Sequence, residues 1–208
     1  AAVRRAAMLR SSTVAAAALL HTGGVEALEQ VGLAVGTPVQ PMLAASEPDP
    51  TAAVARTGLP ALVDAKLDGI RVQVHRDGDE VRVFTRSLDD ITGRLPEVVS
   101  AVRALPHERL VLDGEVLALR EDGRPEVFQA VASRTMSSVD VPAAEQRLPL
   151  RPFFFDVLHV DGQDFLDVGL RERVAAMEAL LPPALLVPRV VADDAEAVET
   201  VFAGWVAD

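Results

Sequence analysis

Asp64-Ala65-Lys66-Leu67-Asp68-Gly69-Ile70-Arg71 is the stretch that decides the fold, because it joins two runs of alternating residues through one glycine. β-branched residues recur at period two in 61–67 and again in 70–76, which indicates a strand on each side. Gly69 permits a tight turn and lets a ligand approach the backbone closely. The stretch therefore predicts a strand–turn–strand unit that carries a lysine.

Lys66 is the only lysine among 20 basic residues. A lysine amine is a nucleophile only when it is neutral, which requires its pKa to fall below the ordinary value of about 10.4. We expect burial at the end of a strand to favour the neutral form. Arg71 could then reach a phosphate or a ribose. A surface hairpin with a solvated lysine explains the same octapeptide, because short patterns recur by chance.

After residue 60 the chain alternates between strands and short helices. Strands are expected at 80–85, 110–112, 115–119, 152–160 and 185–191, and helices at 95–105, 170–181 and 194–206, with a short helix or turn at 127–132. Arg76-Asp77-Gly78-Asp79 has the composition of a hairpin turn. Hairpins outnumber β-α-β units, so the sequence predicts an α+β protein with antiparallel sheets.

The first 35 residues have a helical composition instead. Ser12 or Thr13 can cap a helix at 14–21, which Gly23-Gly24 would end. A further helix fits 25–31, and a proline-punctuated connector follows at 36–41. We place a domain boundary here, between an all-α segment at 1–36 and a second domain at 37–208.

Composition excludes several classes of protein. The 208 residues contain no cysteine, which rules out a disulfide framework, a thiolate metal site and a cysteine nucleophile. The net charge of −11 argues against a protein that coats nucleic acid by bulk charge. The apolar run at 14–20 is too short to span a bilayer. We expect a monomeric cytoplasmic protein without a membrane partner.

Four later segments are candidate functional sites, and each also has a plain structural explanation. Asp113-Gly114-Glu115 could be a turn between two strands, and Arg86 in Thr85-Arg86-Ser87 could be solvated. Phe153, Phe154 and Phe155 could be core aromatics, with Phe153 and Phe155 on one face. Phe128-Gln129 is the fourth segment. The histidines lack metal-ligand spacing and read as structural or exposed.

The order of these segments resembles one family. Lys66-Leu67-Asp68-Gly69-Ile70-Arg71 resembles the nucleotidyl-acceptor motif of the covalent nucleotidyltransferases, which comprise DNA ligases, RNA ligases and capping enzymes. The other four segments resemble later motifs in the same order, and Pro41-Met42-Leu43-Ala44 is similar to a phrase of ATP-dependent DNA ligases. The resemblance covers almost the whole chain and points to the actinobacterial type of ATP-dependent DNA ligase.

The resemblance implies a fold: an antiparallel-sheet nucleotidyltransferase (adenylation) domain of the ATP-grasp-like ligase fold, preceded by a short all-α segment. Residues 1–36 would be the last helices of a DNA-binding domain, and 37–208 the adenylation domain. It also implies nick sealing in DNA repair, replication or recombination, with ATP, Mg²⁺ and nicked double-stranded DNA as the reacting partners. Under this interpretation the protein forms Lys-AMP and joins a 3′-hydroxyl to a 5′-phosphate.

The resemblance assigns roles to individual residues. Lys66 would be the nucleophile, and Glu115 would also help to place the metal. The implied nucleotide-binding residues are Asp64 and Phe155 for adenine, Arg71 and Glu115 for ribose and phosphate, and Arg86 for phosphate or DNA. Asp64 departs from the family, which usually has glutamate at this place; a shorter carboxylate could act after a small shift.

The fourth and fifth motifs of the family do not occur before Asp208. We therefore expect this chain by itself to be a truncated adenylation domain that seals nicks poorly. Two alternatives stay open: an RNA ligase or capping-type nucleotidyltransferase, and a non-catalytic nucleotide- or DNA-binding fragment. An NAD-dependent ligase would need a nicotinamide-binding segment upstream, which these residues do not resemble.

Overall fold

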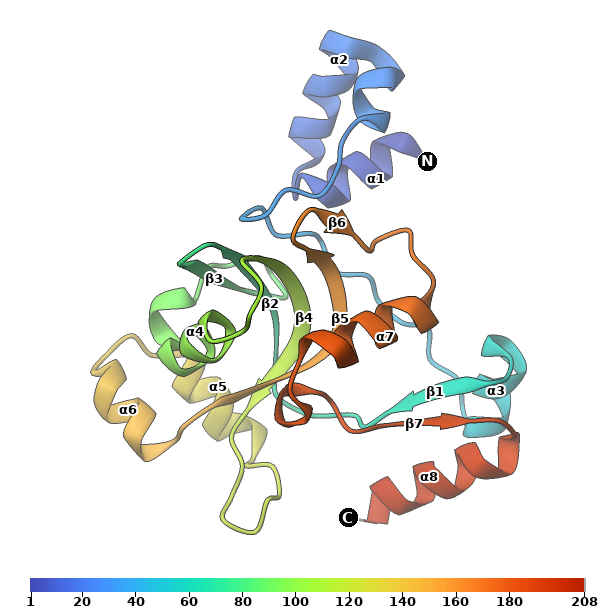
Figure 1. Ribbon diagram of the computed structural model, residues 1–208, viewed down its shortest axis with the longest axis vertical. Helices are drawn as coiled ribbons and strands as arrows, with labels where there is room; N and C mark the ends of the chain where they lie inside the picture. The colour runs from blue at the N-terminus through green and yellow to red at the C-terminus, as the bar shows by residue number, and fades with distance from the viewer. Residues whose placement is uncertain (208) are drawn as a thin grey trace. The chain divides into compact units, whose positions relative to one another are not determined.

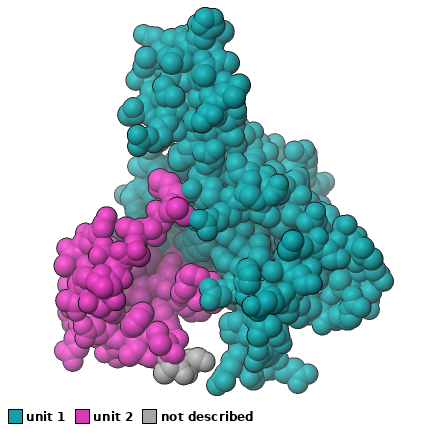
Figure 2. Space-filling view, turned by 180° about the vertical axis from the view of Figure 1, so that it is seen from behind, with its two compact units in different colours: residues 1–41, 68–186 teal, residues 42–67, 187–208 magenta. Residues whose placement is uncertain are grey.

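The computed structural model describes residues 1–207, and the chain divides into two units (Figures 1 and 2). Unit 1 contains residues 1–41 and 68–186, and unit 2 contains residues 42–67 together with those from 187 onward. The chain leaves unit 1 after Pro41, forms the first half of unit 2 and returns to unit 1 at Asp68. Each unit is therefore assembled from segments that are distant in sequence.

A five-stranded antiparallel sheet is the centre of unit 1, with strand order β3-β2-β4-β5-β6. Its strands are β2 Ile70–Asp77, β3 Glu80–Thr85, β4 Arg109–Leu117, β5 Arg151–Val160 and β6 Gln163–Asp164. The helices of unit 1 are α1 Ala2–Leu9, α2 Thr13–Glu29, α4 Pro96–Arg103, α5 Phe128–Met136, α6 Val141–Arg147 and α7 Leu170–Leu180, with 3-10 turns η1 Thr92–Arg94 and η2 Pro183–Leu185. The expected α+β class with antiparallel sheets is confirmed.

One face of this sheet is apolar and packs against helices. Val72 and Val74 of β2 are fully buried, as are Leu112 of β4 and Phe154 of β5. Helix α4 packs against β3 and β5, and α5 against β2 and β4 (Figure 1). Arg76 lies on the same face of β2 and donates hydrogen bonds to backbone carbonyls at the end of α4. The helices therefore close the core on this side.

The opposite face of the sheet is polar. Arg71, Gln73 and His75 alternate along β2, and β4 places Glu115, Asp113 and Val111 directly opposite them. Residues paired in an antiparallel ladder project to the same side of the sheet. The row of charged and amide side chains is thus a consequence of strand register, and it carries most of the candidate site.

The expected break in β4 is wrong. Asp113-Gly114-Glu115 lies inside one continuous strand, Arg109–Leu117, and does not form a turn. A Cβ at Gly114 would lie 2.6 Å from the Phe153 carbonyl oxygen and 2.8 Å from the Phe154 ring. Glycine is required at this position because the neighbouring strand β5 lies too close to leave room for a Cβ. Local sequence does not reveal this packing.

The two helices at the N-terminus form their own apolar cluster. Ser12 caps α2, since its hydroxyl oxygen accepts a hydrogen bond from Ala15 N at 3.1 Å. Gly24, with φ of 70°, kinks α2 where the sequence predicted two separate helices. This segment belongs to the same compact unit as the five-stranded sheet. The domain boundary near residue 37 stays a prediction.

Unit 2 pairs two short strands with two helices. Strand β1, Ala61–Asp64, lies antiparallel to β7, Arg189–Ala192, in the register Ala61↔Ala192. Helix α8, Ala195–Ala207, contacts α3, Pro50–Thr57, a helix that the sequence pattern missed because it follows a proline-rich connector. Asp49 caps α3 at Ala52 N. Across residues 1–207, every helix is too short or too polar to cross a bilayer.

Candidate functional site

Gly69 begins the polar row, immediately before β2. It is buried, and its N–H donates a hydrogen bond of 3.1 Å to Oε1 of Glu115 on β4. A Cβ at position 69 would lie 2.3 Å from the carbonyl oxygen of Val116. Real Cβ atoms do not approach a backbone oxygen so closely, so glycine is required here by contact with the neighbouring strand.

Replacing Gly69 with alanine is expected to push the segment before β2 away from β4 and to break the Gly69–Glu115 bond. Displacing a reacting group by about 1 Å can cost on the order of 10²-fold in rate, and we expect a fall of this size in the nucleotide transfer that the resemblance implies. The measurement is the initial rate of protein labelling by radioactive nucleotide. Gly32→Ala is the matched control, because a Cβ there meets nothing within 4 Å; equal rates for both variants would contradict the prediction.

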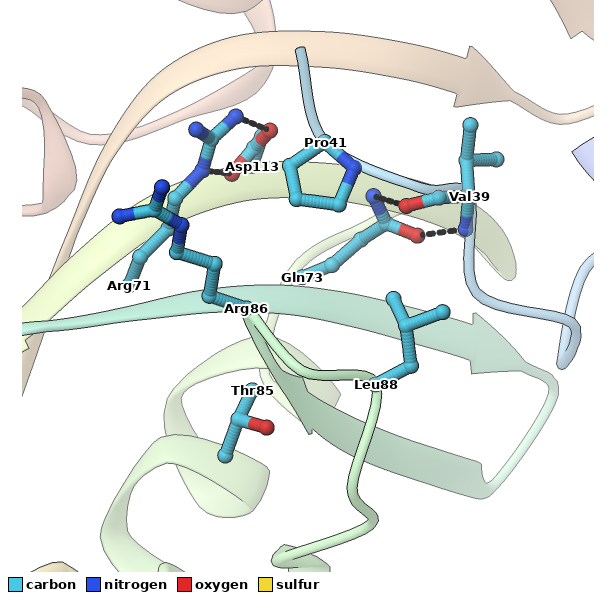
Figure 3. Close-up of a pocket in the computed structure, with 8 residues that line it drawn as sticks. All are labelled: Val39, Pro41, Arg71, Gln73, Thr85, Arg86, Leu88 and Asp113. Carbon is cyan, nitrogen blue, oxygen red and sulfur yellow. Dashed lines mark hydrogen bonds and ion pairs between the residues drawn. The ribbon is translucent and has the colours of Figure 1, made fainter. Parts of the chain in front are cut away.

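Arg71 and Asp113 form a two-pronged ion pair across β2 and β4. Arg71 Nε donates to Oδ1 of Asp113 at 3.1 Å, and its terminal nitrogen donates to Oδ2 at 2.7 Å (Figure 3). Burial raises the pKa of the Asp113 carboxyl, and the guanidinium opposes that shift. The hydrogen bonds from Arg71 to Asp113 raise the pKa of the arginine. The pair fixes the Arg71 plane in a single orientation.

Asp113 is a site residue that sequence reasoning missed. Its segment was singled out, but only Glu115 was given a role. The signal available in the sequence was an acidic residue within an apolar run. In the structure Asp113 is 7% exposed, on the strand that pairs with the strand of Arg71. An ionised carboxylate in such a place needs a cationic partner.

Phe155 lies beside this ion pair because β5 is bulged. Asp113 pairs with Asp156 and Gly114 with Phe154, so Phe155 is the additional residue between two ladder pairs. Bulges turn a side chain to a new direction and are common beside functional sites. The Arg71 guanidinium carbon lies 5.5 Å from the centre of the Phe155 ring. Phe154 is the core aromatic of this segment, with no exposed surface.

Arg86 projects from the turn that follows β3. Asp89 N donates to the Thr85 hydroxyl at 3.2 Å, and the Thr85 and Ser87 hydroxyls lie 3.0 Å apart. Thr85 N also donates to the Asp89 carbonyl at 2.9 Å. These bonds hold the turn while the Arg86 side chain stays exposed, which suits a group that meets an anion from solvent.

An open cleft of about 1040 Å³ lies along this part of unit 1. Its lining includes Gly69, Arg71, Thr85, Arg86, Ser87, Asp90, Arg94, Glu115, Phe128 and Met136. Three arginines and an exposed phenylalanine can receive a ligand that carries both negative charge and a planar ring. The structure thus brings four of the expected residues, Arg71, Arg86, Glu115 and Phe155, into unit 1.

Lys66 and Asp64 belong to unit 2. Lys66 follows β1 and is exposed, with Nζ 3.1 Å from the Leu67 carbonyl oxygen, so its expected burial at the end of a strand is wrong. Strand β1 ends at Asp64, before the lysine, because Ala65 begins a loop. Asp64 accepts a hydrogen bond of 3.1 Å from Arg189 on β7. The roles of both residues stay predictions.

The chain is similar to known proteins over most of its length. The family model for the ATP dependent DNA ligase domain matches residues 41–206. Curated proteins named probable DNA ligase are 57% identical in a Nocardioides species, over 97% of this chain, and 53% identical in Streptomyces griseus, over 95%. The chain spans 38% of the length of each of these relatives.

A solved structure of a DNA ligase domain is also similar to this chain. The ligase domain of LigD from M. tuberculosis is 25% identical, with a TM-score of 0.50, over 70% of this chain and 44% of that one. Its match supports the nucleotidyltransferase (adenylation) fold that the sequence implied. With a family model that covers most of its residues, the chain belongs to the ATP-dependent DNA ligase domain family.

Proposed function

We propose that the protein takes AMP from ATP onto Lys66 and passes it to the 5′-phosphate of nicked double-stranded DNA. The observation that carries this proposal is the cluster formed by Gly69, Arg71, Asp113, Glu115 and Phe155, in a chain of the ligase family. An oriented guanidinium, a carboxylate and an aromatic face suit the phosphate, ribose and base of one nucleotide.

Lys66 is the proposed nucleophile. Its neutral amine attacks the α-phosphorus of ATP, the bond to the bridging oxygen breaks, and pyrophosphate leaves with the electron pair. The amine loses its second proton as the phosphoramidate forms. Two residues separate Lys66 from Gly69, so three Cα–Cα steps of 3.8 Å join them and span at most about 11 Å. Covalent connection alone therefore limits the distance between the Cα atoms of Lys66 and Gly69.

The remaining assignments divide the nucleotide among five side chains. Phe155 stacks on adenine, and Asp64 accepts from its exocyclic amine. Arg71 and Glu115 hold ribose and phosphate. Arg86 binds a phosphate of ATP or of DNA.

A magnesium ion fits this set of residues. Mg²⁺ usually binds one or two carboxylates together with substrate phosphates and water. Glu115, whose carboxylate accepts from the Gly69 amide, is the proposed metal ligand, whereas the Asp113 carboxylate is paired with Arg71. The metal would neutralise charge that develops on the phosphate oxygens.

In the later steps the AMP moves from Lys66 to the 5′-phosphate of the nick. The 3′-hydroxyl then attacks that phosphate, forms the new phosphodiester bond and releases AMP. Arg86 and Arg94 line the cleft. They are the cations that would contact the negatively charged phosphates of the DNA backbone.

Labelling with three nucleotides tests the proposal. The protein is incubated with Mg²⁺ and adenine-labelled ATP, guanine-labelled GTP or adenylate-labelled NAD, and bound label is measured after denaturation. We expect covalent label from ATP only. Label from GTP would indicate a capping-type enzyme, label from NAD an NAD-dependent ligase, and ATP binding without covalent label a non-catalytic module. Nicked DNA added afterwards should remove the label from the protein.

A further inference from the structure

The polar face of β2 carries two buried side chains that take no part in the cluster around Arg71. Gln73 and His75 are 6% and 2% exposed, and both hydrogen-bond to the connector at 36–41. The connector joins the N-terminal helices to the rest of the chain. Two polar side chains are therefore buried on this face to hold a loop.

His75 holds the start of the connector. Gly36 N donates a 2.9 Å hydrogen bond to Nδ1 of His75, so the ring proton must lie on Nε2, which faces Oε1 of Gln73 at 2.9 Å. Burial is the largest influence on the pKa of His75 and lowers it to about 4. The neutral ring that this bond requires is thus the form present near neutral pH.

Gln73 holds the middle of the connector. Its Oε1 accepts from Val39 N at 2.6 Å, and its Nε2 donates to the Val39 carbonyl at 3.3 Å (Figure 3). One amide side chain thereby satisfies both backbone groups of a buried residue, as an additional strand would. Buried backbone groups require such partners.

Val39 also belongs to the apolar cluster of the N-terminal helices, together with Leu9 and Leu28. Gln40 N donates to the Met8 carbonyl at 3.1 Å, and the Ser11 hydroxyl donates to the Pro38 carbonyl. The connector is therefore bonded to α1 on one side and to β2 on the other.

Pro41 ends this segment beside the ion pair. It lines a narrow recess with Val39, Arg71, Gln73, Arg86 and Asp113 (Figure 3). Gln73 lies directly opposite Asp113 in the ladder and two residues from Arg71 on the same face. The proline ring thus lines the same recess as the ion pair that orients Arg71.

We propose that Gln73 and His75 are positioning residues that clamp the connector at 36–41 onto β2 and so couple the N-terminal helices to the Arg71–Asp113 pair. Release of the clamp removes Pro41 and admits water to the pair, which weakens the attraction between the two charges. The part of the inference that concerns nucleotide rests on the proposed function; the coupling itself does not.

Gln73→Leu tests the clamp, because leucine has a similar volume and cannot hydrogen-bond. We expect amide hydrogen exchange at Val39 and exchange of the Arg71 side-chain Nε–H each to rise at least about tenfold, measured by NMR on the full chain. Both readouts need no nucleotide. With ATP, we expect the KM for self-labelling to rise about tenfold while the maximal rate changes less than about threefold, since Lys66 is untouched.

Four other variants separate the clamp from general destabilisation. Gln40→Leu is the matched control in the same connector, where the glutamine side chain is exposed. His75→Asn keeps an acceptor for Gly36 N near the Nδ1 position and should preserve protection of that amide, whereas His75→Leu should lose it. Gln73→Glu keeps both bonds to Oε1 and should therefore preserve protection of the Val39 amide, whereas His75→Leu tests the clamp if Gln73→Leu does not fold.

The coupling is overturned if the Val39 amide opens while Arg71 Nε–H exchanges as in the unaltered protein, or if Val39 exchange does not change. Failure of ATP to label the unaltered protein would refute the proposed function, and the two exchange measurements would still decide the coupling. An increased KM in Gln40→Leu equal to that in Gln73→Leu would also overturn it.

Discussion

Lys66→Arg is expected to abolish covalent AMP on the protein. Arginine keeps the positive charge and much of the length of the side chain, but its guanidinium cannot lose a proton near neutral pH and so cannot attack phosphorus. Intact-protein mass spectrometry after incubation with ATP and Mg²⁺ should show one added AMP in the unaltered protein and none in the variant. We expect the loss to exceed about 10³-fold, because no other group can take over a nucleophile's role.

The sequence offers a sharp control for this result, since it contains a single lysine. Arg82→Lys introduces a second lysine at a side chain that is 48% exposed and paired with Glu80. Label should remain on Lys66 alone in that variant, as read by peptide mapping. Label at position 82, or label retained in Lys66→Arg, would refute the assignment.

Asp113→Asn is expected to have the next largest effect, on both stability and nucleotide binding. Asparagine matches the shape of aspartate but leaves Arg71 facing a neutral amide. The loss of one partner from a buried ion pair costs about 3–5 kcal/mol. Because the Arg71 and Asp113 side chains are 28% and 10% exposed, solvent reduces this, and we expect about 2 kcal/mol. The affinity for ATP should fall by roughly 10–100-fold as Arg71 loses its orientation.

Urea unfolding measures the first effect, and equilibrium binding of ATP measures the second. Asp77→Asn is the matched control, because its ion pair with Arg109 joins side chains that are 60% and 52% exposed. Exposed pairs contribute about 0–1 kcal/mol. If the two variants have the same urea midpoint and the same ATP affinity, the Arg71–Asp113 pair does not have the role assigned to it.

Local sequence was sufficient for much of the fold. The strand at 80–85 has the bounds that alternation predicted, and those at 70–77 and 151–160 differ by one residue. Periodicity is local because each side chain's face depends only on its neighbours in the chain. Helix α3 was missed because it begins at Pro50, in a proline-containing stretch that resembled a connector. Helix α6, which has Pro142 as its second residue, was also missed.

Some features of the candidate site were likewise predictable from local sequence, and others were not. The run from Lys66 to Arg71, together with the four later motifs in the same order, pointed to the ligase family without any structure, since residue types and their spacing are themselves the signal. Expected burial of Lys66 failed because burial depends on what packs over the end of β1. The bulge at Phe155 could not be predicted from sequence either. The additional residue in β5 is recognised only from how β5 pairs with β4.

The sequence by itself supplied the candidate reacting groups and predicted the strands on which Arg71, Glu115 and Phe155 lie. Only the tertiary structure decided which of them meet. Asp113 reaches Arg71 across 42 residues, and Gln73 reaches Val39 across 34. Both contacts depend on which strand or connector lies beside β2 and in which register. Packing over the whole unit sets that choice, because a shift by one residue would turn every side chain of a strand to its other face.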